Sequence, residues 1–152
     1  MKIGLGADHR GAQAAKLLND RLASLGHSVV PYSHLNGEAC DYPIPAFHLG
    51  RALAKGEIDK GILICGTGIG MCIAANKIAG VRAAIAHDEL TAEISRTHND
   101  ANVLCLSADL LGQRLIEKLV DTWLSTPFQG GRHARRLEEI AAIEQGRDPA
   151  VR

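Results

Sequence analysis

The stretch GILICGTGIGMCIAANK, from Gly61 to Lys77, decides the fold class of this chain. It opens with an apolar run, GILIC, that has no polar face and therefore predicts a strand buried on both sides of a sheet. Three glycines follow at alternate positions, Gly66, Gly68 and Gly70, and then a segment with helical character. A buried strand, a glycine turn and a helix in this order are typical of a parallel α/β domain.

The same alternation of short apolar runs and longer helical patterns extends along the whole chain. Strands are expected at 2–6, 27–32, 59–65, 81–86 and 102–107, and helices at 11–25, 45–55, 71–80, 88–97, 110–125 and 132–145. One domain over residues 1–152 is predicted, with a doubly wound parallel sheet of five strands, the strand at 59–65 in its centre, and helices on both faces. Ligands of such sheets bind at the carboxyl ends of the strands.

Composition excludes several classes of protein. Lysine plus arginine and aspartate plus glutamate both number 17, so the chain lacks the basic excess of a nucleic-acid-binding protein. No apolar run reaches the roughly 20 residues of a membrane span, and the N-terminus does not resemble a signal peptide. The four cysteines form no CxxC pair, which indicates reduced thiols in a cytoplasmic protein; they are Cys40, Cys65, Cys72 and Cys105.

The glycine turn, CGTGIG, is the first candidate site. Its glycines allow close approach of a ligand, and the amides before the next helix can hold an oxyanion, but the spacing is not that of a dinucleotide or ATP loop. Thr67 adds a hydroxyl group. Cys65 is either an activated base or nucleophile, or a small buried hydrophobic residue. For Cys72 and Cys105 the sequence favours packing.

Two further polar clusters are expected at the same edge of the sheet. In GADHRG, Asp8 and His9 follow the first strand and either move protons or cap the next helix. In SRTHNDANV, His98 and Asn99 either reach the site or belong to a turn, and turn chemistry explains Asn99 more easily than His98.

The segment GGRHARR completes the set of candidates. Arg132 and Arg136 are four residues apart on one helical face, where they either clamp a phosphate or form a solvated helix start. The seven histidines form no HExxH or paired Cys/His motif, so neither a metal nor another cofactor is expected. An acid/base pair, a thiol beside an oxyanion cradle and an arginine clamp suit proton abstraction next to the carbonyl of a phosphorylated sugar.

Together, GADHRG, DYP, GILICGTGIGMCIAANK, AGVRAA, SRTHNDANV and GGRHARR resemble the ribose-5-phosphate isomerase type B family, which includes galactose-6-phosphate isomerase subunits. The resemblance spans residues 2–145. It implies a Rossmann-like three-layer α/β/α fold and a metal-free aldose-ketose isomerase of pentose phosphate metabolism. It also implies a homodimer or a dimer of dimers in which the C-terminal helix packs on the partner and each site is shared between subunits.

The resemblance also implies roles for particular residues. Cys65 would be the base that moves a proton between C1 and C2 of ribose 5-phosphate, and Thr67 with the amides of Gly66, Gly68, Ile69 and Gly70 would hold the enediolate. Asp8 and His98 would assist ring opening. His9, Arg132 and Arg136 would bind phosphate, whereas Tyr42 and Asn99 would position the sugar. In one branch of the family, a glutamate after the glycine turn serves as the base instead of the cysteine. This chain has Met71 at the position of that glutamate.

One position departs from the family pattern. Asp109 stands where many members have a phosphate-binding arginine, and a carboxylate repels a phosphate. Arg10 is a candidate to replace the missing positive charge. Two alternatives therefore remain at this point: an isomerase of a different aldose or of a six-carbon sugar phosphate, and a sugar-phosphate-binding domain without catalysis.

Overall fold

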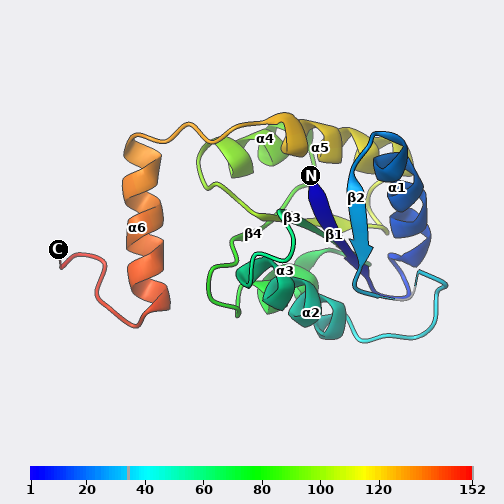
Figure 1. The fold of residues 1–152 in the computed structure, drawn as a ribbon, viewed down its shortest axis with the longest axis horizontal. Coiled ribbons are helices and arrows are strands. Elements are labelled where there is room, and N and C mark those ends of the chain that lie inside the picture. The colour runs from blue at the N-terminus through cyan, green and yellow to red at the C-terminus, as the bar shows by residue number, and fades with distance from the viewer. Residues whose placement is uncertain (34, 152) are drawn as a thin grey trace.

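The computed structural model describes residues 1–33 and 35–151, and these contain five strands and six helices (Figure 1). The strands are β1 (Lys2–Ala7), β2 (Ser28–Pro31), β3 (Lys60–Cys65), β4 (Ala83–Ile85) and β5 (Val103–Ser107). The helices are α1 (Ala12–Ser24), α2 (Pro43–Ala54), α3 (Ile69–Ala75), α4 (Glu89–Thr97), α5 (Gln113–Ser125) and α6 (Arg132–Glu144). Among these described residues, no helix is long and apolar enough to cross a membrane.

All five strands are parallel and lie in the order β2-β1-β3-β5-β4, which confirms the predicted sheet and its central strand. The chain leaves β1 toward one edge for β2 and crosses back to β3 for the other half of the sheet. The strand order therefore reverses between β1 and β3, and in open parallel sheets ligands bind at the carboxyl ends of strands beside such a reversal. Cys65 is the last residue of β3 and pairs with Ser107 at the end of β5.

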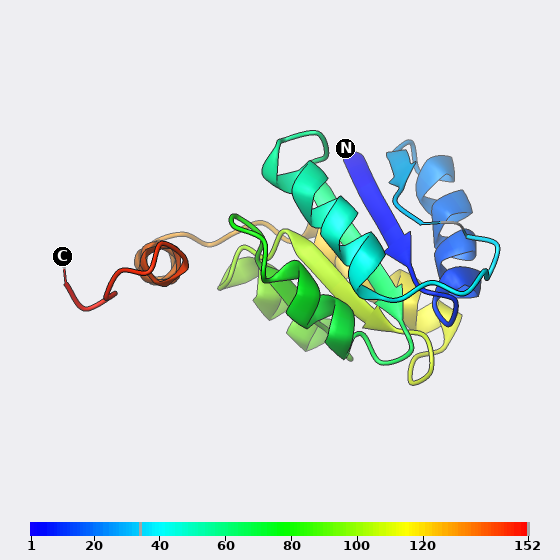
Figure 2. The ribbon, with the colours of Figure 1, turned by 90° about the horizontal axis from the view of Figure 1, so that it is seen from below.

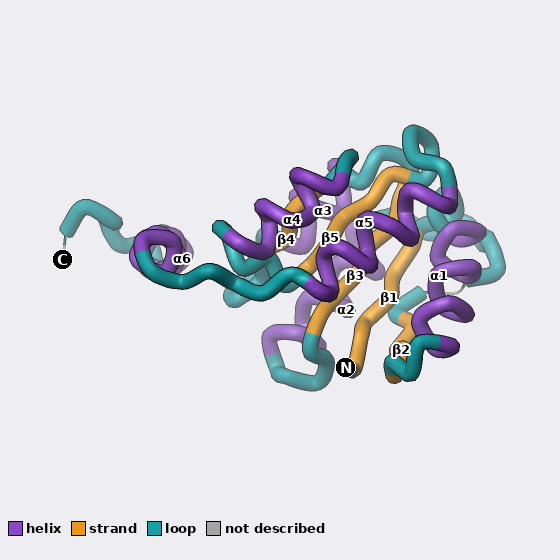
Figure 3. The backbone as a smooth tube through the Cα atoms, turned by 90° about the horizontal axis from the view of Figure 1, so that it is seen from above, coloured by secondary structure: helices purple, strands orange, loops and turns teal. Residues whose placement is uncertain are grey.

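Helices cover both faces of the sheet and make two cores. Ile62 and Ile64 of β3 point to the face covered by α1, α4 and α5 (Figure 3), whereas Leu63 and Cys65 point to the face covered by α2 and α3 (Figure 2). Because successive side chains of a strand alternate between faces, the buried run GILIC supplies both cores. Helix α6 stands apart from both layers at the end of an extended connection (Figures 1 and 2).

Helix boundaries differ from prediction by three residues or more at two places. The helix after the glycine turn ends at Ala75 rather than near Gly80, because the side chain of Asn76 hydrogen-bonds the backbone of Ala83 in both directions. The Asn76 amide donates to the carbonyl oxygen at 2.9 Å, and its oxygen accepts from the N–H at 2.8 Å. These bonds draw the chain toward β4. Helix α5 begins at Gln113, three residues later than expected.

Candidate active site

The glycine turn places the Cys65 thiol beside a backbone amide. Gly68 donates its N–H to Sγ of Cys65 at 3.1 Å, and the thiol residue is only 4% exposed. Gly68 has φ +78°, and a Cβ there would lie 3.1 Å from the backbone of Leu106. Only glycine avoids both the left-handed strain and this contact, so the residue type at 68 determines how the turn folds back over the sulfur.

The rest of the turn presents hydrogen-bond donors close to this sulfur. Thr67 is exposed, and its hydroxyl oxygen accepts the N–H of Ile69 at 3.3 Å. Within residues 1–33 and 35–151, the backbone N–H groups of Thr67 and Gly70 donate no hydrogen bond to another residue. A thiol, a hydroxyl group and two unused amides therefore lie on one short loop at the carboxyl end of β3.

The end of β5 holds the turn in place, and the sequence did not predict this support. The hydroxyl of Ser107 donates to the carbonyl oxygen of Gly66 at 2.6 Å and accepts the N–H of Leu110 at 3.0 Å. The amides of Ala108 and Asp109 donate to the carbonyl oxygens of Cys65 and Gly66 at 2.9 and 3.0 Å. Only the serine at the end of the apolar run NVLCLS hinted at this contact in the sequence.

Asp8 lies in the loop after β1 and is buried, with 7% of its surface exposed. Its Oδ1 atom accepts the N–H groups of Arg10 and Gly11, both at 2.9 Å, while its own N–H donates to the carbonyl oxygen of Ile64 at 3.2 Å. These bonds do not cap α1, whose N-cap residue is Gly11 without a side-chain cap hydrogen bond, so this oxygen of the carboxylate instead holds the loop before the helix. His9 lies next to it in the exposed part of the loop.

Arg10 and Asp109 form an ion pair above Gly66. Nε of Arg10 lies 2.9 Å from Oδ2 and 3.2 Å from Oδ1 of Asp109, and the pair raises the pKa of the guanidinium. A Cβ on Gly66 would lie 2.8 Å from Oδ2 of Asp109, which places the pair directly over the turn. The carboxylate at position 109 is thus neutralised by an arginine that bonds through Nε, the inner nitrogen of its guanidinium.

Tyr42, just before α2, lies on another side of the turn. A Cβ on Gly70 would be 2.6 to 2.9 Å from three atoms of the tyrosine ring, so the ring rests against this glycine. The tyrosine is 45% exposed. Loops from three separate parts of the chain, after β1, before α2 and after β5, therefore meet the turn.

His98 and Asn99 do not lie at this edge, so the prediction that all three polar clusters share the carboxyl ends is wrong. They follow α4 and precede β5, where Asn102 accepts the N–H of Gly61 at 2.9 Å and donates its own N–H to Arg82 at 3.0 Å. These bonds join the beginnings of β3, β4 and β5. At about 3.3 Å per residue, the six residues of β3 separate the two edges by roughly 17 Å.

Arg132 and Arg136 are exposed on α6 and belong with the distant cluster rather than with Cys65. His133 links them to it, because its ring stacks on His98 with centroids 4.1 Å apart and planes 9° from parallel. Burial of His133, together with the neighbouring His98 and the positive charges of Arg132 and Arg136, lowers the pKa of its imidazole. Sequence inspection passed over His133 because it lies between more conspicuous arginines.

The remaining cysteines, Cys40, Cys72 and Cys105, are free thiols of the described structure. Cys105 is fully buried, which agrees with the predicted packing role. Cys72 is half-buried, and the hydrogen bonds of its sulfur with Cys105 and Asn76 lower the pKa of its thiol to about 7. Cys72 is therefore more acidic than a packing residue needs to be.

A cavity of 780 Å³ lies beside α2 and the end of β2, where Tyr32, His48 and Arg51 are among its lining residues and Cys65 is not. Across residues 1–33 and 35–151, no three His, Cys, Asp or Glu side chains come close enough to hold a metal ion. The candidate site is therefore the glycine turn itself, with unused amides and a buried thiol.

These features define a class: a parallel α/β protein with a thiol and a glycine cradle at the reversal point of its sheet. Comparison with known sequences gives the family. A family model described as Ribose/Galactose Isomerase matches residues 3–140. The chain belongs to the ribose/galactose isomerase family.

Individual relatives cover nearly the whole chain. Ribose-5-phosphate isomerase B of Escherichia coli is 44% identical over 97% of this chain and 99% of its own. D-erythrulose-4-phosphate isomerase of Pectobacterium atrosepticum is 39% identical over 95% of each chain. The solved structure of ribose-5-phosphate isomerase B from Clostridium thermocellum is 44% identical, covers 96% of this chain and 99% of its own, and superimposes with a TM-score of 0.94.

Proposed function

We propose that this protein is an aldose-ketose isomerase that interconverts ribose 5-phosphate and ribulose 5-phosphate through an enediolate. The observation that supports it best is the Cys65 thiol, held 3.1 Å from the Gly68 amide on the same loop as two unused N–H groups. Isomerisation needs one base to move a proton between neighbouring carbons and donors to stabilise the oxygen that gains charge. The family and the names of the relatives agree with this reaction.

The proposed mechanism gives Cys65 the proton transfer. Its thiolate removes the proton from C2 of the open-chain aldose. The Cys65 thiol, whose proton exchanges with solvent, then protonates C1, while the proton of the C2 hydroxyl passes to O1, which carries the negative charge of the enediolate. Thr67 and the amides of Gly66 to Gly70 bind that oxygen. The Gly68 N–H, which now bonds the sulfur, is shared with the oxygen as the sulfur takes up the proton.

Ring opening and substrate positioning fall to neighbouring loops. Asp8 acts through Oδ2, since its other oxygen accepts two amides. His9 binds the phosphate, and the Tyr42 ring positions the sugar against Gly70. Arg10 compensates for the carboxylate of Asp109 and offers its outer nitrogens to the phosphate, because the ion pair uses Nε.

A second copy of the chain completes the site. His98, the predicted proton donor for ring opening, and Asn99 lie at the opposite sheet edge, too far to serve Cys65 of their own chain. Four apolar side chains beside the turn are at least half exposed: Ile44 and Phe47 of α2 and Ile69 and Ile73 of α3. An exposed apolar patch of this kind marks an interface.

Helix α6 supports the same homodimer. Ile140 and Ile143 are 44% and 61% exposed and line a hollow of 510 Å³ between α6 and the beginning of β4. A helix that stands apart with an uncovered apolar side gains stability by packing on another subunit. We propose that it does so and thereby brings Arg132, Arg136, Asn99 and His98 of the partner subunit to the Cys65 turn. Two such dimers can pair into a tetramer.

The test combines a variant with a tracer. Cys65→Ala is expected to lose about a thousandfold or more of kcat, because no general base remains, while ribose 5-phosphate still binds. Cys65→Ser is the conservative control, and EDTA should leave activity unchanged. Solvent deuterium should enter the substrate only with intact Cys65. Substantial turnover by the alanine variant contradicts the assignment of the base. Absence of both exchange and ketose formation in the wild type would leave only sugar-phosphate binding.

The relatives differ in the sugar that their names specify, and Asp109 places a carboxylate beside the proposed phosphate position. A panel of four-, five- and six-carbon aldose phosphates with the matching free aldoses therefore belongs to the same experiment. The highest kcat/KM with ribose 5-phosphate supports the proposal, whereas a higher value with another sugar changes the substrate and leaves the reaction intact.

A further inference from the structure

The segment that carries His98 and Asn99 is held by an unusual backbone conformation at Asp100. Its φ is +42°, the only positive value of a non-glycine residue within 1–33 and 35–151. Its N–H donates to the carbonyl oxygen of Arg96 at 3.1 Å, and the N–H of Ala101 donates to Ser95 at 2.9 Å. Left-handed backbone is unfavourable for a residue with a Cβ, so other contacts must hold the segment in this form.

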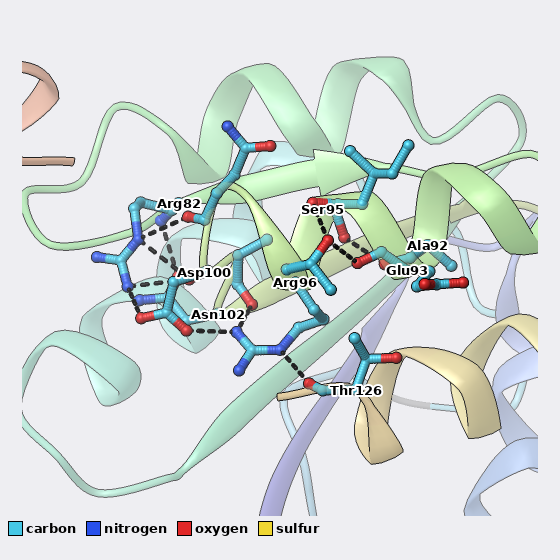
Figure 4. Close-up of polar contacts among 12 residues, drawn as sticks. Arg82, Ala92, Glu93, Ser95, Arg96, Asp100, Asn102 and Thr126 are labelled. Atoms are coloured by element: carbon cyan, nitrogen blue, oxygen red, sulfur yellow. Dashed lines mark hydrogen bonds and ion pairs between the residues drawn. The ribbon is translucent and has the colours of Figure 1, made fainter. Parts of the chain in front are cut away.

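Two guanidinium groups supply those contacts from either side (Figure 4). Nη2 of Arg82 lies 2.9 Å from Oδ2 of Asp100, and Nη1 of Arg96 lies 2.7 Å from Oδ1. Arg82 also donates from Nε to the carbonyl oxygens of Asn99 and Asp100, at 3.3 and 3.1 Å. The Arg96 side chain is 9% exposed, so water screens its bond to the carboxylate only weakly.

Arg96 also reaches a second segment. Its Nε donates to the carbonyl oxygen of Thr126 at 3.3 Å, and its Nη1 donates to that of Ala101 at 2.7 Å (Figure 4). Next to it, the N–H of Gln129 donates to the carbonyl oxygen of Thr97 at 3.1 Å. Thr126 and Gln129 belong to the connection that leads to α6. One buried arginine therefore ties the His98 segment to the beginning of the path toward Arg132.

Aromatic contacts at two places fix the surroundings of this network. The Arg96 guanidinium lies over the Trp123 ring at 5.7 Å from its centroid, and Lys60 approaches the same ring at 5.7 Å. At the far end, the His98 ring stacks on His133 of α6. Contacts at both ends of the connection thus set the place of α6 relative to His98.

We propose that Arg96, with Asp100 and Arg82, is a positioning unit for the half-site that each chain contributes to its partner. The unit touches no substrate and acts by setting the distance between His98 and the arginines of α6. It rests on the proposed function, in which His98, Asn99, Arg132 and Arg136 complete the site of the second copy. A network that only stabilised the fold would affect both halves of the site alike.

Four variants separate these roles. Arg96→Met keeps the length of the side chain and removes its bonds, Arg96→Lys keeps the charge, and Asp100→Asn keeps shape and left-handed tolerance without the charge. Arg21→Met is the matched control, because Arg21 is ion-paired with Asp121 on α5 and contacts neither half-site. Displacement by about 1 Å should lower kcat of Arg96→Met between about tenfold and about a hundredfold. Asp100→Asn should lose less, and Arg96→Lys should recover part of the loss.

The deciding measurement mixes subunits. In an equal mixture of Cys65→Ala and Arg96→Met chains, half of the dimers contain one chain of each variant. Each such dimer has one intact site, which combines Cys65 of the Arg96→Met chain with Arg96 of the Cys65→Ala chain. About a quarter of wild-type activity should return, well above either variant alone. The same mixture with His98→Ala gives the reference value. Asp100→Asn replaces Arg96→Met if the latter does not fold.

Each result separates the inference from the function on which it rests. Recovery with Arg96→Met equal to that with His98→Ala supports the positioning unit. Recovery with His98→Ala but none with Arg96→Met overturns it, because Arg96 would then act on the Cys65 half of its own chain or on the fold as a whole. A Cys65→Ala chain that is active alone, or no recovery with His98→Ala, refutes the proposed function itself. Unchanged kcat in folded Arg96→Met also overturns the inference.

Discussion

Alanine at position 11 would place a methyl group inside the backbone of β3, one residue before Cys65. A Cβ on Gly11 would lie 2.1 Å from the carbonyl oxygen of Ile64 and 2.6 Å from its carbonyl carbon. Both atoms belong to the central strand, which is paired on each side and cannot yield. The loop after β1 must therefore move away from β3.

That movement breaks two hydrogen bonds, one inside the loop and one between the loop and the strand. They are the bond from the Gly11 N–H to Oδ1 of Asp8, at 2.9 Å, and the bond from the Asp8 N–H to Ile64, at 3.2 Å. Each contributes about 1 kcal/mol, and the overpacking costs about 1–3 kcal/mol more. Gly11→Ala should lower the free energy of unfolding by about 3–5 kcal/mol, which corresponds to a fall in Tm of roughly 6–20 °C at this chain length.

The assay is urea and thermal unfolding followed by circular dichroism, with kcat measured on the folded protein. Gly26→Ala is the control, because its φ of +83° strains alanine while nothing lies within 4 Å of the new Cβ. It should cost only about 1–2 kcal/mol. If Gly11→Ala were no less stable than Gly26→Ala, the close approach between the β1 loop and β3 would not be a determinant of the site.

Two further predictions concern charge. Arg10→Ala leaves Asp109 unpaired beside the proposed phosphate position, so KM for ribose 5-phosphate should rise about tenfold or more. The value of kcat/KM for free ribose should stay the same, because free ribose has no phosphate. Equal loss on both substrates would contradict a role of Arg10 in phosphate binding. For His133, the lowered pKa means that the unfolded chain binds a proton more readily than the folded chain, so stability present above about pH 6.5 is lost as the pH falls. His133→Gln should reduce the decrease in Tm between about pH 7 and about pH 5, and it should do so more than His48→Gln, a control at an exposed position. Equal decreases in the two variants would show that His133 does not contribute to the pH dependence of stability.

Most of the glycine turn could be predicted from neighbouring residues in the sequence. The apolar run that ends at Cys65 and the glycines at 66, 68 and 70 predicted a buried strand, a tight turn and a helix, because these depend on neighbouring residues and on backbone freedom. The central position of β3 followed from the same run, since only a strand covered on both faces lacks a polar side. The end of α3 did not follow, because Asn76 meets Ala83 only after the chain has turned.

Two features of the site needed the fold. Arg10 and Asp109 are 99 positions apart, and their pairing over Gly66 depends on β1, β3 and β5 ending side by side. His98 looked like part of the Cys65 edge, yet it lies at the opposite end of the strands, because a connection between parallel strands returns the chain to the starting edge.

The sequence by itself determined the alternation of strands and helices, the buried central strand and the turn that holds the thiol. The tertiary structure alone decided the strand order, the partner of Arg10, and the division of the candidate residues between two edges. The physical reason is the distance along the chain over which each interaction acts. Periodicity and glycine conformation act over a few residues, whereas strand order and shared edges arise from burying the two faces of the sheet under helices that are distant in the chain.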